Sequence, residues 1–138
     1  MEKSLDNTLK RSDLITMSPL VLAYIGDTVY ETYIRDHLIK CNKNKKVNDL
    51  HKLAINYVKA KAQSDIIHSI EDELTEEEQR IYKRGRNQKS HTSPKNGDII
   101  DYKHATGFEA LIGYLYLDKQ LDRLEYLVVK SIKFIENI

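Results

Sequence analysis

The sequence predicts an all-α fold, organised as one compact helical bundle across residues 1–138. Apolar residues recur every three to four positions through most of the chain, which is the spacing of an amphipathic helix. Only two prolines and five glycines occur in 138 residues, and no segment shows the strict alternation of a strand. With 41% hydrophobic and 31% charged residues, the chain can fill the core of one domain and keep a hydrated surface.

The first helix is expected from Pro19 to about Lys40. Ser18 is a suitable N-cap, and proline fits the first helical position because its N–H would have no intrahelical partner there. One face of this helix is apolar and consists of Leu22, Ile25, Val29 and Tyr33. The polar stretch 42–44 is expected to end it.

Two further helical segments are expected before residue 90. Asn48 is a candidate N-cap for a segment that continues to Ile70, with a bend near Ala60. Its inward face consists of Leu50, Leu53, Ala54, Tyr57, Ile66, Ile67 and Ile70. Thr75 and Glu78 match a capping box, so a short helix should run from there to about Arg84.

Residues 87–101 are expected to form a long loop, because Ser, Thr, Asn, Pro and Gly dominate them and no helical stripe is present. Loops of this length in compact domains tend to be functional or disordered. A helix from about Tyr102 to Leu117 and a final amphipathic helix from about Leu121 complete the expected bundle.

Two carboxylates about 80 residues apart lie among apolar neighbours in the expected helices. Asp27 follows Gly26, and Glu109 lies two residues after Gly107. A carboxylate in such surroundings is costly to desolvate unless a cation or hydrogen bonds compensate. Mg²⁺ prefers oxygen ligands and can stabilise charge on a phosphodiester during displacement. The pair therefore suggests a shared magnesium site.

Longer strings around both acids carry a family resemblance. The strings are 22–31, LAYIGDTVYE, and 108–117, FEALIGYLYL, supported by NDLHK at 48–52, KRGRN at 83–87, KS at 89–90 and TSPKN at 92–96. In this order and at this spacing they resemble the ribonuclease III family, and more closely its small bacterial branch, Mini-ribonuclease III. The resemblance extends from about Ser18 to Val129.

The resemblance implies a magnesium-dependent endoribonuclease that cuts double-stranded RNA. It also implies a ribonuclease III-type catalytic domain that works as a homodimer, with Asp27 and Glu109 as catalytic and metal-binding residues. Its substrate would be the precursor of the large-subunit (23S) ribosomal RNA, and a ribosomal protein is a candidate assisting partner.

Two departures from the larger enzymes of the family change these expectations. Those enzymes carry further acids four residues before the aspartate and three before the glutamate, where this chain has Ala23 and Thr106. Asp98 or Asp101 is a candidate replacement. The alternative for both is a capping role, which the sequence favours, and Asp101 is well placed to cap the helix that follows. The chain ends at Ile138, so no double-stranded RNA-binding domain is expected.

A basic stretch that lacks acids runs from Gln79 to Gly97, on a chain whose net charge is only +1. Such a stretch is typical either of contacts with a polyanion or of an ordinary solvated loop. Given the resemblance, we expect RNA contacts from Lys83, Arg84, Arg86, Asn87 and Lys89.

The remaining sequence features favour a cytoplasmic protein with no membrane association. Cys41 is the only cysteine, the N-terminus lacks the apolar core of a signal peptide, and the apolar runs are too short to cross a bilayer. Two alternative functions stay open. One is a non-catalytic double-stranded RNA-binding protein on the same fold, and the other is an all-helical magnesium hydrolase of nucleotide pyrophosphates.

Overall fold

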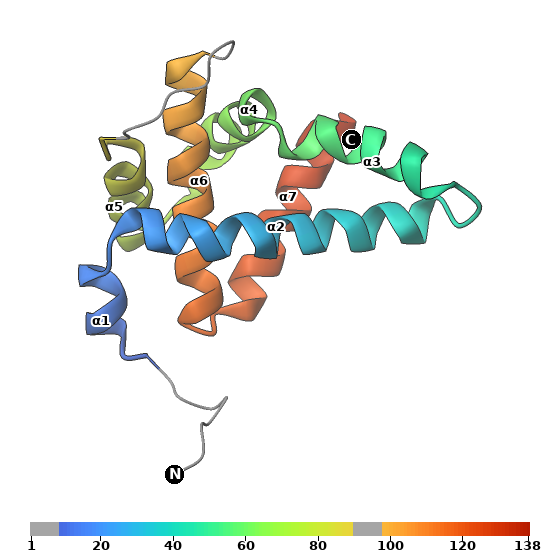
Figure 1. Cartoon of the computed structure of the whole chain (residues 1–138). Coiled ribbons are helices and arrows are strands. Elements are labelled where there is room, and N and C mark those ends of the chain that lie inside the picture. Colours follow the sequence, from blue (N-terminus) through green and yellow to red (C-terminus); the bar gives the residue numbers. More distant parts are fainter. Residues whose placement is uncertain (1–8, 90–97) are drawn as a thin grey trace.

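The computed structural model describes residues 9–89 and 98–138, and this part of the chain is helical without strands. Figure 1 shows the arrangement of its elements. They are α1 (Arg11–Thr16), α2 (Pro19–Cys41), α3 (Val47–Val58), α4 (Ala60–Ile70), the 3₁₀ turn η1 (Glu71–Glu73), α5 (Glu76–Arg86), α6 (Ile99–Leu117) and α7 (Leu121–Glu136). The prediction of an all-α protein is therefore confirmed.

The crossing of α2 and α6 forms the centre of the bundle (Figure 1). The backbones of these helices touch, because two glycines remove the side chains between them. A Cβ atom added at Gly26 would lie 1.8 Å from the backbone oxygen of Glu109, and one added at Gly113 would lie 1.9 Å from that of Leu22. Beside the crossing, the ring of Tyr30 packs edge-on against Phe108 with centroids 5.0 Å apart.

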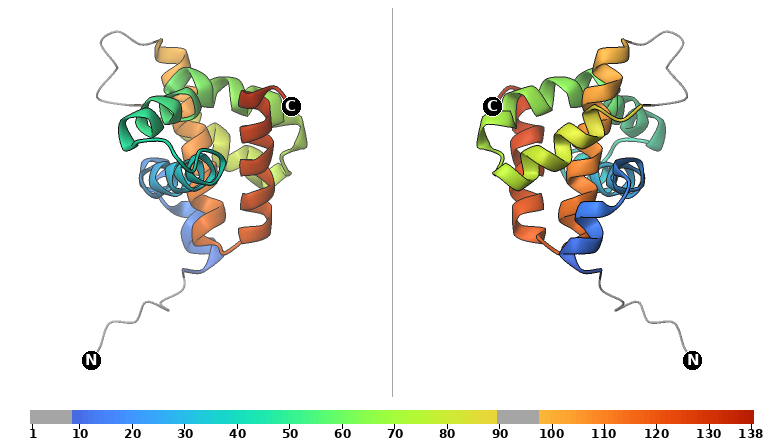
Figure 2. Two further views of the ribbon diagram at one scale, coloured as in Figure 1. Left: turned by 90° about the vertical axis from the view of Figure 1, so that its right-hand side faces the viewer. Right: turned by 90° about the vertical axis from the view of Figure 1, so that its left-hand side faces the viewer.

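Helices α4, α5 and α7 surround α6 on the sides that α2 leaves free. Both α4 and α5 pack against it, and α7 lies beside it in the views of Figures 1 and 2. The contact with α5 also depends on glycine, since a Cβ atom at Gly107 would lie 2.6 Å from Tyr82. Large apolar side chains with no solvent exposure fill the space between the helices: Leu22, Ile34, Ile66, Ile67, Leu111, Leu115, Leu124 and Leu127.

Several helix boundaries in the structure differ from those expected from the sequence. The expected bend near Ala60 is a break at Lys59, whose extended backbone separates α3 from α4. Helix α3 begins at Val47 with Lys46 as N-cap, so the prediction of Asn48 as the cap was wrong. Helix α6 begins at Ile99, because the Asp98 carboxylate accepts hydrogen bonds from the N–H groups of Ile100 (2.7 Å) and Asp101. Asp98, and not Asp101, is therefore the cap.

Helix α1 was not predicted. It has six residues and buries only Leu14, so it is too short to give a periodic signal. Its position depends on a distant side chain, since the Arg84 guanidinium donates hydrogen bonds to the carbonyl oxygens of Ile15 and Met17. Across residues 9–89 and 98–138, no helix has the combination of length and apolarity that crossing a bilayer requires.

Candidate active site at the crossing of two helices

The crossing of α2 and α6 brings Asp27 and Glu109 together. Gly26 contacts the backbone of Glu109, so the next residue of α2, Asp27, lies beside the Glu109 side chain. The two carboxyl groups are close enough for Asp27 to raise the pKa of Glu109. Asp27 is exposed and Glu109 is half-buried, so the pair has one side toward solvent and one toward the core.

The environment of Glu109 favours its protonated form. Burial is the main cause that raises the pKa of Glu109 to about 8, and the charge of Asp27 and the hydrogen bond with it act in the same direction. A hydrogen bond from Gln63 opposes them by stabilising the carboxylate. With a pKa of about 8, Glu109 therefore holds its proton at neutral pH when no cation is bound.

A divalent metal ion fits this donor set. Two carboxyl groups that repel each other when both are ionised can be held together by a cation in place of the proton. Hard divalent ions accept one or two protein carboxylates and complete their coordination with water. Asp27 and Glu109 would hold the ion.

Gln63 on α4 is a further polar residue at this site that sequence analysis did not identify. Its Nε2 donates to a Glu109 carboxylate oxygen (3.3 Å) and to the carbonyl oxygen of Val58 (3.0 Å). The side chain is only 1% exposed. A signal was present, since Gln63 occupies a helical position in register with the buried residues Ile66, Ile67 and Ile70.

An open cavity of about 290 Å³ lies on the solvent side of Asp27. It is lined by Asp27, Thr28, Glu31, Thr32 and Arg35, all from α2. Glu31 and Arg35 form an ion pair one helical turn apart, so the charge of Glu31 is balanced within the helix. The cavity gives a substrate access to Asp27.

The two candidate replacement acids are not part of this cluster. Asp98 caps α6, and Asp101 lies eight residues before Glu109, which is about 12 Å along a helix. Ala23 and Thr106 are buried, and the Thr106 hydroxyl donates to the carbonyl oxygen of Tyr102. Within residues 9–89 and 98–138, no three His, Cys, Asp or Glu side chains gather in a way that could hold a metal ion.

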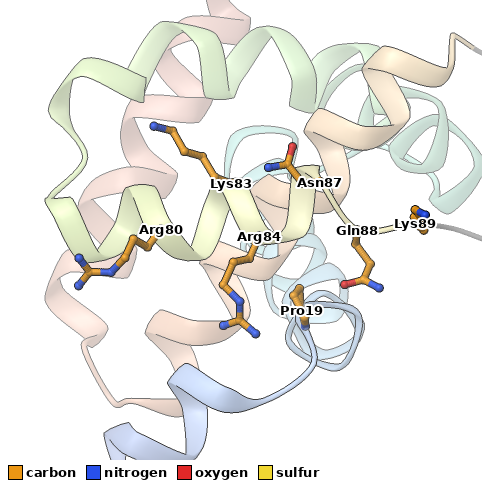
Figure 3. A pocket seen from close by; sticks show the side chains of 7 residues that line it. All are labelled: Pro19, Arg80, Lys83, Arg84, Asn87, Gln88 and Lys89. Atoms are coloured by element: carbon orange, nitrogen blue, oxygen red, sulfur yellow. The ribbon is translucent and has the colours of Figure 1, made fainter.

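A basic cavity of about 640 Å³ lies along α5 and the start of α2 (Figure 3). Of the five expected RNA-binding residues, four line it: Lys83, Arg84, Asn87 and Lys89. Arg80 and Gln88 also line it and were not among the expected residues.

Both of the expected RNA-binding arginines make contacts within the protein. Arg84 binds the carbonyl oxygens of Ile15 and Met17 at the junction of α1 and α2. Arg86 does not line the basic cavity. Its guanidinium lies 5.6 Å from the centre of the Tyr82 ring, and its Nε donates to Asn87. Loop residues 90–97, which continue the expected basic stretch, lie outside the described residues.

Comparisons with known proteins identify a family that this chain matches. The model of the ribonuclease III domain matches residues 20–120. The chain is 49% identical to Mini-ribonuclease 3 of Thermoanaerobacter sp., over 99% of each chain. It is 54% identical to Mini-ribonuclease 3 of Clostridium tetani, over 91% of this chain and 83% of that one.

The structure has a solved relative as well. A crystal structure of a protein from Fusobacterium nucleatum superimposes with a TM-score of 0.78 at 34% sequence identity, covering 88% of this chain and 96% of that one. Asp27 and Glu109 both lie within the stretch that the domain model matches. The chain therefore belongs to the ribonuclease III family and is an endoribonuclease that acts on double-stranded RNA.

Proposed function

We propose that this endoribonuclease uses Mg²⁺ held by Asp27 and Glu109 to cleave its RNA substrate. The observation that carries the proposal is the placement of these two acids side by side at the α2–α6 crossing. Enzymes of the family use a divalent metal ion, and magnesium suits a site with few protein ligands because it retains several waters. When bound, the ion supplies positive charge that stabilises a phosphodiester undergoing in-line displacement.

The two acids have different tasks in this proposal. Glu109 is fixed from the core side by Gln63, whereas Asp27 faces the open cavity from which RNA approaches. Because the raised pKa of Glu109 keeps a proton on this residue, ion binding displaces that proton.

The basic cavity is proposed to contact the phosphates of an RNA duplex. Lys83 and Lys89 line it, and the guanidinium of Arg80 adds a third positive charge. An A-form duplex is recognised mainly by its shape, phosphates and 2′-hydroxyl groups, so binding should depend strongly on salt and weakly on sequence.

A homodimer is part of the proposal. At the start of α2, Leu20, Val21 and Tyr24 form an exposed apolar face, and Tyr24 is 80% exposed. A face of this kind marks an interaction site. Sedimentation at micromolar concentration should show a dimer, and a purely monomeric protein would contradict this part.

The resemblance to Mini-ribonuclease III supports the natural substrate. We propose that the chain processes the precursor of 23S ribosomal RNA in the cytoplasm, with a ribosomal protein as a candidate assistant. Cleavage of a precursor transcript at one position, with the mature end as product, would support this assignment.

The site is tested by incubating the protein with a long end-labelled RNA duplex, with Mg²⁺ or with a chelator. Asp27→Asn and Glu109→Gln should abolish cleavage and leave folding and RNA binding intact. Asp36→Asn is the matched control, because Asp36 is an exposed acid on the same helix that pairs with Lys40. Retained cleavage in Asp27→Asn would overturn the proposed site.

A further inference from the structure

Gln63 has one half of its amide satisfied and the other half without a partner. Its Nε2 makes two hydrogen bonds, to Val58 (3.0 Å) and to Glu109 (3.3 Å). Its Oε1 is buried and has no hydrogen-bond partner among the described residues. A buried acceptor left in this way costs free energy, so native proteins nearly always pair such groups with protein or water.

The orientation of the amide is fixed by its surroundings. The Val58 carbonyl lies at the end of α3, where no intrahelical N–H is available to it, and it can only accept a hydrogen bond. Turning the amide over would place Oε1 against this acceptor and release both bonds of Nε2. Oε1 therefore stays on the side of the amide that faces away from Val58.

This free oxygen lies close to the proposed metal site. The two heteroatoms of a planar amide are about 2.3 Å apart. Since Nε2 is 3.3 Å from the Glu109 carboxylate, Oε1 lies within about 6 Å of the same carboxylate oxygen. That separation is suited to a group that contacts the water around an ion held by Glu109.

We propose that Gln63 is a positioning residue for the metal site: its Nε2 orients Glu109, and its Oε1 accepts a hydrogen bond from a water molecule that hydrates the ion. This inference rests on the proposed function of Asp27 and Glu109. Ala23 and Thr106 leave the ion with few protein ligands and hence with more waters, and these waters need acceptors in the protein.

A purely structural role would make Gln63 only a donor that caps α3. The two roles are separated by the choice of variant. Gln63→Met keeps the length of the side chain and removes both donor and acceptor, whereas Gln63→Glu removes the donor and keeps acceptor oxygens. Gln79→Met is the matched control, because Gln79 also donates to a backbone carbonyl (Glu71, 2.7 Å) but does not contact Glu109.

The test measures binding of Mn²⁺ alone to each folded protein by electron paramagnetic resonance, and the Mg²⁺ concentration that gives half-maximal cleavage. Gln63→Met should weaken Mn²⁺ binding at least about tenfold and raise the required Mg²⁺ similarly. Gln63→Glu loses the donor that orients Glu109 but keeps acceptor oxygens, so it should weaken Mn²⁺ binding by less than about tenfold. Gln79→Met should bind Mn²⁺ as the unmodified protein does. If Gln63→Met does not fold, Gln63→Glu carries the test.

The measurements distinguish failure of the role proposed for Gln63 from failure of the proposed metal site. If Asp27→Asn loses Mn²⁺ binding but Gln63→Met retains it, or if Gln63→Glu binds Mn²⁺ tenfold more weakly, the role of Gln63 is overturned and the metal site stands. If Asp27→Asn itself retains full Mn²⁺ binding, the proposed metal site is overturned and the inference falls with it.

Discussion

Gly26 and Glu109 touch through their backbones, and this contact places the two acids of the site side by side. A Cβ atom on Gly26 would lie 1.8 Å from the Glu109 carbonyl oxygen and 2.8 Å from its carbonyl carbon. No flexible side chain is available to move aside, so any larger residue must separate α2 from α6. The stability of the core and the geometry of the site therefore depend on the same glycine.

Gly26→Ala should destabilise the protein by about 3 kcal/mol or more, because overpacking at a backbone contact forces whole helices apart. Urea unfolding followed by circular dichroism measures this loss. Thr28→Ala, at an exposed position on the same helix, should change stability by less than about 0.5 kcal/mol. Equal stability of the two variants would show that the helices do not cross as described.

The raised pKa of Glu109 predicts how stability depends on pH in the absence of metal. In the unfolded chain this carboxyl titrates near its usual value of about 4.3, whereas in the folded protein it titrates near 8. The folded state therefore binds more protons between these values, and stability falls as pH rises through this window.

Glu109→Gln should remove that fall, since the amide keeps the shape and carries no charge. Urea unfolding at intervals between pH 5 and 9, with a chelator present, compares the variant with Asp36→Asn. We expect the Glu109 variant to be the more stable protein near pH 9 and to have no metal-dependent cleavage. A wild-type protein whose stability rises through this window would contradict the account of Glu109.

Two neighbouring cations on α5 should behave differently. Arg84 donates to the carbonyl oxygens of Ile15 and Met17, so Arg84→Ala should cost about 1–3 kcal/mol of stability. Lys83 lines the basic cavity. Lys83→Ala should leave stability unchanged and reduce the slope of log affinity for duplex RNA against log salt by about 1. Fluorescence anisotropy at several salt concentrations provides this slope. An unchanged slope in Lys83→Ala would show that Lys83 does not contact the RNA phosphates.

The pair of Arg123 and Glu78 is expected to be a major stabilising contact outside the site. Glu78 is 3% exposed and accepts two hydrogen bonds of 2.9 Å from Arg123. Arg123→Met leaves a buried carboxylate without its cation and should cost about 3 kcal/mol. Lys40→Met removes the exposed pair with Asp36 and should cost less than about 1 kcal/mol. Thermal unfolding of both variants tests this difference, and similar losses would contradict it.

Helical periodicity predicted the long elements because burial of one face repeats along them. Helix α2 and most of α6 follow from that pattern, but α6 begins at Ile99, three residues before the expected start at Tyr102. The break after Cys41 was predicted from the polar stretch 42–44. Helix α1 does not, since its position depends on Arg84 from a segment about 70 residues later in the chain. Contacts between distant segments leave no periodic signal.

In the candidate site, too, some residues were identified from the sequence and others depend on contacts between distant segments. Asp27 and Glu109 were identified from the strings around them, and the structure places them together. The role of Gln63 depends on the packing of α4 against α6, because this packing fixes the distance between Gln63 and Glu109. The only sequence signal for Gln63 was a polar residue at a buried position of a helix. Asp98 was ambiguous between ligand and cap, because both roles suit an acid before a helix, and the structure shows the cap.

The most direct test of the central claim is an anomalous difference map from crystals of the protein grown with Mn²⁺. The account predicts a peak within coordination distance of Asp27 and Glu109, with Gln63 Oε1 in contact with a water molecule bound to the ion. A protein that cleaves duplex RNA but whose anomalous peak lies away from both carboxylates would contradict it.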